Sequence, residues 1–110
     1  MPGISIHVVD VSRGLVAAGM KIELMRNGSP IAVGETSDKG LLEVRETMTQ
    51  DFYEALFYVG DWYRAQGVAL PQIAFLDVVT FRFGIDDPRQ HYHLPFKCTP
   101  WGYSCFRGGA

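Results

Sequence analysis

The chain has 110 residues, with 47% hydrophobic and 20% charged side chains, the balance of an ordinary globular protein. Its net charge of −2 and the lack of a basic run exclude the phosphate-neutralising surface on which nucleic-acid binding depends. No stretch approaches the roughly 20 apolar residues of a membrane span, and no secretory signal begins the sequence. We therefore expect one cytoplasmic domain, residues 1–110, with no nucleic-acid or membrane partner.

Period-2 alternation of apolar side chains predicts a succession of short strands. They cover residues 4–9, 21–26, 30–35, 41–44 and 53–59, and part of residues 73–85. Asn27-Gly28 predicts a tight hairpin, because both residues tolerate positive φ. Residues 60–67 predict a helix of about two turns, with Asp61 as the N-cap and Gly67 as the C-terminal stop.

The last part of the chain predicts a hairpin whose first strand carries a His-x-His pair. Alternation places Tyr92, Leu94 and Phe96 on one face, which we expect to be the core. His91 and His93 then project from the opposite face. With the earlier strands, this hairpin predicts an all-β sandwich with one short helix.

Four segments form a recognisable combination: SIHVVD at residues 5–10, YRAQG at residues 63–67, FRF followed by DDP at residues 81–88, and HYHLP with the later YS and RG of residues 91–108. In these segments the chain resembles the 5-hydroxyisourate hydrolases, relatives of transthyretin. The resemblance implies a Greek-key, transthyretin-like (prealbumin) β-sandwich of two antiparallel sheets. It also implies a homotetramer built as a dimer of dimers, a small-molecule substrate of purine metabolism and no cofactor.

The same resemblance implies the roles of particular residues. His7 of the first strand and His93 match the catalytic histidines of the family. Leu41 stands where the family has an active-site arginine, and Gly109 stands where it has a terminal serine. Arg45 lies four residues beyond Leu41, on the same face of a regular strand. Whether Arg45 compensates for Leu41 stays open at this point.

The residues expected to contact the substrate are Leu41, Arg45, His91, Phe106, Arg107 and Gly109. Hormone-binding transthyretin is small at the position of Phe106, whereas the hydrolases have tyrosine there. A bulky Phe106 therefore favours the shallow pocket of the enzyme branch. Together with Leu41 and Gly109, it makes the expected pocket less polar than a ureide would prefer.

Two other chemistries are disfavoured. A zinc site of His7, His91 and His93 is conceivable, but no motif places an acidic or cysteine ligand, so no metal site is predicted. Cys105 as a nucleophile would need to face the site, and alternation puts it on the face opposite Phe106. With no secretory signal, Cys98 and Cys105 are expected to be free thiols.

General acid–base hydrolysis by His7 and His93 is the function that we expect, on a small cyclic amide or ureide. One alternative is a repurposed homologue that cyclises, isomerises or opens a different, more apolar molecule. Another is a non-catalytic, transthyretin-like binder. The sequence leaves open whether hydroxyisourate itself is turned over.

Overall fold

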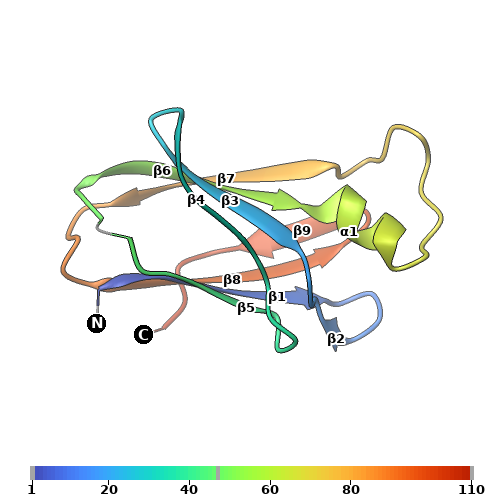
Figure 1. Ribbon diagram of the computed structural model, residues 1–110. Helices are drawn as coiled ribbons and strands as arrows, with labels where there is room; N and C mark the ends of the chain where they lie inside the picture. Colours follow the sequence, from blue (N-terminus) through green and yellow to red (C-terminus); the bar gives the residue numbers. More distant parts are fainter. Residues whose placement is uncertain (1, 47, 110) are drawn as a thin grey trace.

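Two β-sheets packed face to face form the molecule, and one short helix covers one end (Figure 1). The computed structural model describes residues 2–46 and 48–109. The first sheet consists of β1 (Gly3–Asp10), β2 (Leu15–Val16), β5 (Leu41–Val44), β8 (His91–Thr99) and β9 (Gly102–Cys105). The second consists of β3 (Lys21–Arg26), β4 (Ser29–Glu35), β6 (Asp51–Tyr58) and β7 (Val78–Ile85). The predicted β-sandwich is confirmed.

One strand pair departs from the predicted antiparallel arrangement. β1 and β8 run parallel, with pairing from Gly3 opposite His91 to Asp10 opposite Cys98. The first sheet is therefore mixed, and the prediction of two purely antiparallel sheets was wrong for this pair. Hairpin signals report only on strands joined by a tight turn. The chain between β1 and β8 instead passes through the whole second sheet, which serves as the long crossover that a parallel pair requires.

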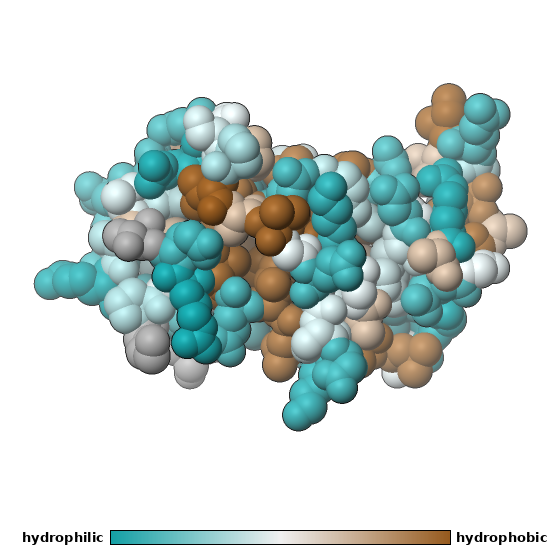
Figure 2. Space-filling view, in the orientation of Figure 1, coloured by the Kyte–Doolittle hydropathy of each residue, from teal (hydrophilic) through white to brown (hydrophobic). Residues whose placement is uncertain are grey.

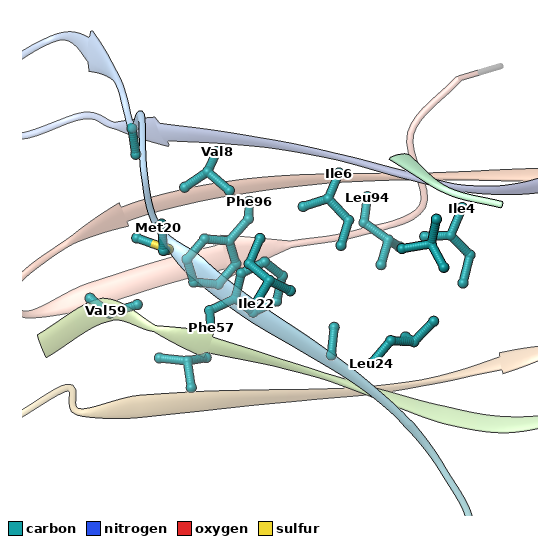
Figure 3. Packing of buried hydrophobic residues seen from close by; sticks show 14 of the residues in the cluster. Ile4, Ile6, Val8, Met20, Ile22, Leu24, Phe57, Val59, Leu94 and Phe96 are labelled. Atoms are coloured by element: carbon teal, nitrogen blue, oxygen red, sulfur yellow. The ribbon is translucent and has the colours of Figure 1, made fainter. Parts of the chain in front are cut away.

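The core lies between the sheets and is built from the inward faces of the strands other than β2 (Figure 3). β1 contributes Ile4, Ile6 and Val8, each at most 1% exposed. The rings of Phe57 from β6 and Phe96 from β8 stack across the interface, with centroids 3.8 Å apart. This burial holds one face of β1 and β8 inward, so the other face of both strands is fixed outward.

The hairpin between β3 and β4 turns at Asn27 and Gly28, as predicted. Both residues have positive φ, 49° and 77°. This is the conformation that a two-residue turn of the primed type needs in order to match the twist of its strands.

The helix α1 (Val59–Ala65) begins earlier than predicted, with Tyr58 at its N-cap and Asp61 inside its first turn. The prediction of Asp61 as the N-cap was wrong. The backbone N–H of Gly60 donates to the carbonyl oxygen of Asp77 over 3.0 Å, so one free donor of the helix start is satisfied by the chain that leads into β7. Gly67, with φ of 81°, ends the helix as expected.

A buried polar cluster fixes the helix to the end of β1. The Tyr63 hydroxyl donates to Oδ1 of Asp10 over 2.6 Å, and Nε of Arg13 donates to Oδ2 over 2.7 Å. Burial alone raises the pKa of the Asp10 carboxyl, but the hydrogen bonds from Ser12, Tyr63 and Arg13 outweigh it and lower the pKa below its ordinary value. Asp10 is therefore held as a carboxylate. Over the residues described, none of the helices is long and apolar enough to cross a membrane.

Candidate active site

The outward face of β5, β1 and β8, here called the histidine face, carries all three histidines. Tyr92, Leu94 and Phe96 are buried, as the alternation predicted, while His91 and His93 are half-buried on the opposite side of β8. His7 is half-buried on the same face of the adjacent strand. The structure thus brings the three imidazoles onto one surface.

The register of the strands arranges this face in rows that cross the sheet. One row holds Glu43, Ser5 and His93, because Ser5 pairs with both of the others. The next row holds Leu41, His7 and Pro95. His7 and His93 are therefore diagonal neighbours on adjacent strands. Standard strand spacing puts their Cα atoms about 8 Å apart. A small molecule lying between these rows meets both imidazoles.

Ser5 joins two of the imidazoles directly. Its Oγ lies 2.7 Å from Nδ1 of His93 and 2.8 Å from Nε2 of His91. Each distance is that of a good hydrogen bond. The hydroxyl therefore fixes the orientation of both rings, and Nε2 of His93 is the ring nitrogen that this contact leaves available.

Leu41 faces outward beside His7 with 42% of its surface exposed. The row of His7 is consequently flanked by apolar groups on both sides, Leu41 and Pro95. A guanidinium at the position of Leu41 would project onto the same face, and its replacement by an isobutyl group removes a bidentate donor from this row.

Arg45 lies at the other end of the face, beside His91. Both line a small cavity of about 70 Å³, which Glu43 also lines. The guanidinium of Arg45 makes an ion pair with Glu43, with an N–O distance of 2.6 Å, and 73% of the Arg45 side chain is exposed. The histidine face thus has a charged end near His91 and an apolar end near Leu41.

The segment after β9 crosses the histidine face. The backbone N–H of Gly108 donates to the carbonyl oxygen of His93 over 2.7 Å. A Cβ at Gly108 would lie 2.8 Å from Cγ of Pro95 and 3.0 Å from Cδ2 of His93, so only glycine permits this approach. At Gly109 a Cβ would meet nothing within 4 Å. Phe106 is 46% exposed and follows Cys105, whose side chain packs against the core, so alternation directs the phenyl ring outward.

The structure does not bring Arg107 to the imidazoles. Its guanidinium carbon lies 4.0 Å from the ring centroid of Tyr92, a side chain on the opposite face of β8. Its NH2 group also donates to Gln90 Oε1 over 3.0 Å and to the carbonyl oxygen of His91 over 3.3 Å. This cation–π contact and these bonds give Arg107 a structural role at the sheet edge. Its expected contact with substrate has no geometric support.

Both cysteines are free thiols, as expected, and both face inward. Burial raises the pKa of Cys105 to about 12 and that of Cys98 to about 11. A thiol with so high a pKa is almost wholly protonated near neutral pH and is a poor nucleophile. This argues against Cys105 as a covalent catalyst.

Outside the three residues left undescribed, no group of three or more His, Cys, Asp or Glu side chains has the arrangement of a metal site. His91 and His93 are instead occupied with the hydroxyl of Ser5. The observed contacts suit proton transfer.

A second hollow opens between the sheets, at the edge strands β4 and β5. It has a volume of about 240 Å³. Apolar side chains form most of its walls: Ile6, Ile22, Leu24, Ala32, Val33, Leu42 and Val44. Figure 2 shows hydrophobic surface between the two sheets on this side of the molecule. Its described lining includes glutamates but no imidazole, thiol or cation. We therefore place the candidate active site on the histidine face.

Sequence reasoning overlooked three residues of this face: Ser5, Glu43 and Gly108. Alternation puts Ser5 on the face of His7, and that signal was available in the sequence. Glu43 shares its face with Leu41 and Arg45 for the same reason. The contact of Gly108 with His93 depends on the path of a segment beyond the last strand, which no periodicity describes.

Comparison with known proteins gives a consistent result. Residues 4–108 match the model of the HIUase/Transthyretin family. A 5-hydroxyisourate hydrolase of Ralstonia nicotianae is 40% identical over 98% of this chain and 99% of its own length. A protein of the same name from Deinococcus radiodurans is 38% identical over 97% of this chain and 96% of its own.

Two solved structures resemble the fold closely. The 5-hydroxyisourate hydrolase of Klebsiella pneumoniae superposes with a TM-score of 0.85 at 27% identity, covering 99% of this chain and 100% of its own. An (S)-allantoin synthase superposes with a TM-score of 0.88 at 31% identity, covering 97% of this chain but 43% of its own.

Proposed function

Because the chain belongs to the HIUase/Transthyretin family, we propose that it is a hydrolase of the 5-hydroxyisourate hydrolase type. Its reaction opens or rearranges a small cyclic amide or ureide by acid–base catalysis. The observation that carries this proposal is the placement of His7 and His93 on one face of two adjacent strands, with His93 oriented by Ser5.

Hydrolysis of a cyclic amide needs a base to activate water and an acid to protonate the leaving nitrogen. Imidazole performs both tasks near neutral pH. We assign these two tasks to His7 and His93, which approach a substrate between them from adjacent strands. The proton that the pair takes from water is matched by the proton that the pair gives to the departing nitrogen.

Polarisation of the substrate carbonyl needs a donor, and Leu41 supplies none. On the histidine face the guanidinium of Arg45 lies at the end marked by His91 and Glu43. We propose that Arg45 binds the polar or anionic edge of the substrate, with its exposed side chain free to leave Glu43 for a ligand. The substrate then lies with its polar edge toward Arg45 and its less polar edge toward Leu41.

Leu41 supports a second candidate function: the same acid–base pair acting on a different, more apolar cyclic molecule. Leu41 and Pro95 flank His7, and Phe106 is exposed in the segment that directly follows β9. These groups favour an apolar substituent over the hydrogen-bonding edge of a ureide.

We further propose that the protein assembles as a homotetramer, a dimer of dimers, with the histidine face turned toward a neighbouring copy. The partial exposure of Leu41 and Phe106, at 42% and 46%, supports this, since a second copy would cover both. Light scattering at micromolar concentration tests it, and a monomer would contradict the assembly.

The proposed reaction is tested by following freshly generated 5-hydroxyisourate by its ultraviolet absorbance, with and without the protein. Faster decay than the spontaneous reaction is expected, and heat-treated protein provides the blank. A panel of cyclic amides and ureides with apolar substituents, run in parallel, separates the two candidate functions. Decay of every compound at its spontaneous rate would overturn both.

A further inference from the structure

The hydroxyl of Ser5 lies between two imidazoles and has only one proton. Its Oγ is 2.8 Å from Nε2 of His91 and 2.7 Å from Nδ1 of His93. The hydroxyl can donate to one of these nitrogens and must then accept from the other, which has to carry a proton. The protonation of the two rings is therefore coupled through Ser5.

Two arrangements satisfy both hydrogen bonds when the rings are neutral and the hydroxyl donates to one of them. In the first, Nδ1–H of His93 donates to Ser5, whose O–H donates to Nε2 of His91. In this arrangement Nε2 of His93 has a free lone pair and is a base. In the second, Nε2–H of His91 donates to Ser5, whose O–H donates to Nδ1 of His93. Nε2 of His93 then carries a proton, which it can give to a substrate while Nδ1 receives a proton back through Ser5.

We propose that Ser5 is a proton relay that converts His93 between its basic and acidic forms and makes His91 the place where the proton is stored. This inference rests on the proposed function for its catalytic meaning. Ser5 is a positioning residue, since it acts through His93.

The proton balance of the relay is complete without any other reactant. Nε2 of His93 takes a proton from the attacking water, which adds to the substrate as hydroxide. Nδ1 of His93 then passes its proton to Ser5, and Ser5 passes its own to Nε2 of His91. His91 becomes an imidazolium, and His93 is left neutral with a proton on Nε2. As Nε2 gives that proton to the leaving nitrogen, His91 returns its stored proton through Ser5 to Nδ1 of His93, so no imidazolate forms and the starting arrangement is restored.

The titratable and charged groups around the relay come from several elements, and an ion pair lies next to His91. On β1 the neighbouring titratable group is His7, and on β8 it is Lys97, at the other end of the face. Beside β5, Glu43 and Arg45 line the cavity next to His91 as an ion pair. Glu43 also pairs in register with Ser5, so it lies in the row of the relay, with its carboxylate paired to Arg45. After β9, Arg107 donates to the carbonyl oxygen of His91 over 3.3 Å.

The test that does not depend on any substrate is nitrogen NMR of protein labelled with ¹⁵N-histidine. In the wild type we expect His91 and His93 to show complementary tautomers at the nitrogens that face Ser5, and to bind protons as a coupled pair. Ser5→Ala should remove this complementarity and let the two rings titrate independently. Ser5→Thr keeps a hydroxyl and should preserve the wild-type pattern. Unchanged histidine spectra in a folded Ser5→Ala variant would overturn the relay.

Backbone amide spectra establish whether each variant is folded. If Ser5→Ala does not fold, His91→Asn gives an independent criterion, because asparagine can still bond to Ser5 but cannot store a proton. The Nδ1 environment of His93 should then persist, while the coupled titration should disappear. A His93 titration identical to the wild type in this variant would also overturn the proposal.

Kinetics supply the second readout. Ser5→Ala should lower kcat by about 10–100-fold, the usual loss when a group that orients a histidine is removed, and leave KM nearly unchanged. Ser5→Thr should restore most of the rate. If the wild type opens no cyclic amide, the proposed function fails, whereas the NMR criterion for the relay remains decisive by itself.

Discussion

The backbone N–H of Gly108 donates a hydrogen bond to the carbonyl oxygen of His93 over 2.7 Å, so the segment after β9 lies directly against β8. A Cβ at this position would lie 3.0 Å from Cδ2 of the His93 ring. The His93 imidazole can therefore occupy its observed position because residue 108 has no side chain.

Substitution of Gly108 tests this contact. Gly108→Ala should displace the segment or the His93 ring and lower the rate of hydrolysis substantially, with little change in the unfolding temperature. Gly109→Ala is the matched control, since a Cβ at Gly109 meets open space. Steady-state kinetics and thermal unfolding of both variants are the measurements, and equal rates for the two would contradict the assignment.

His93 itself should dominate the rate. We expect His93→Ala to lower turnover by roughly 10²–10⁴-fold, the range for losing a general acid–base group. Thr80→Ala, an exposed change on β7 in the other sheet, should leave the rate unaltered. A His93→Ala protein that retains most of its activity would remove His93 from the mechanism.

Restoring the polar groups should raise the hydrolysis of hydroxyisourate. In the double variant Leu41→Arg, Gly109→Ser, the new guanidinium projects beside His7, and the serine fits without a clash. A charge-assisted hydrogen bond contributes about 1.5–3 kcal/mol, which corresponds to roughly 10- to 150-fold if it forms in the transition state. Leu41→Gln with Gly109→Ser is the control, because glutamine adds polarity without charge. A folded double variant with no gain would mean that other positions set the substrate.

The hydrogen bonds and ion pair of the Asp10 carboxylate make the stability of the fold depend on pH. The pKa of this carboxyl lies below the unfolded value of about 3.9. Its bonds therefore stabilise the fold fully above that pH, and this contribution is lost as the pH falls through the folded pKa. Asp10→Asn should cost about 1.5–3 kcal/mol at neutral pH and flatten the acid dependence.

Urea denaturation between pH 2 and 7 measures the effect of Asp10→Asn on the free energy of unfolding. Asp87→Asn provides the comparison: its carboxylate is also paired, with Arg89, but this pair lies at the surface, where solvent screens it. A loss from Asp10→Asn no greater than that from Asp87→Asn would contradict the anchoring role.

Alternation alone predicted which side chains of β8 face the core and which face outward. Tyr92 and Leu94 are buried and His91 and His93 are not, because a strand with one buried face allows only one choice. Alternation assigns a face but not a neighbour. The contact of Ser5 with both imidazoles depends on the register of two strands paired 88 positions apart, which no local pattern encodes.

The arginines illustrate the same limit. Arg45 and Arg107 were both expected near the substrate. The structure places Arg45 beside His91, whereas Arg107 stacks on Tyr92 behind the strand. A long flexible side chain at a strand end goes to whichever partner the tertiary structure offers, and spacing along the sequence does not identify that partner.

The parallel pairing of β1 with β8 also has a consequence for biosynthesis. At about 5–20 residues per second, the 88 positions between Ser5 and His93 take roughly 4–18 s to translate. During this interval the edge of β1 that β8 will cover is open backbone, able to pair with a strand of another nascent chain. A half-made chain thus carries an aggregation-prone edge and only one of the two histidines to which we assign proton transfer. The β1 edge stays uncovered, and His93 is absent, until β8 has been synthesised.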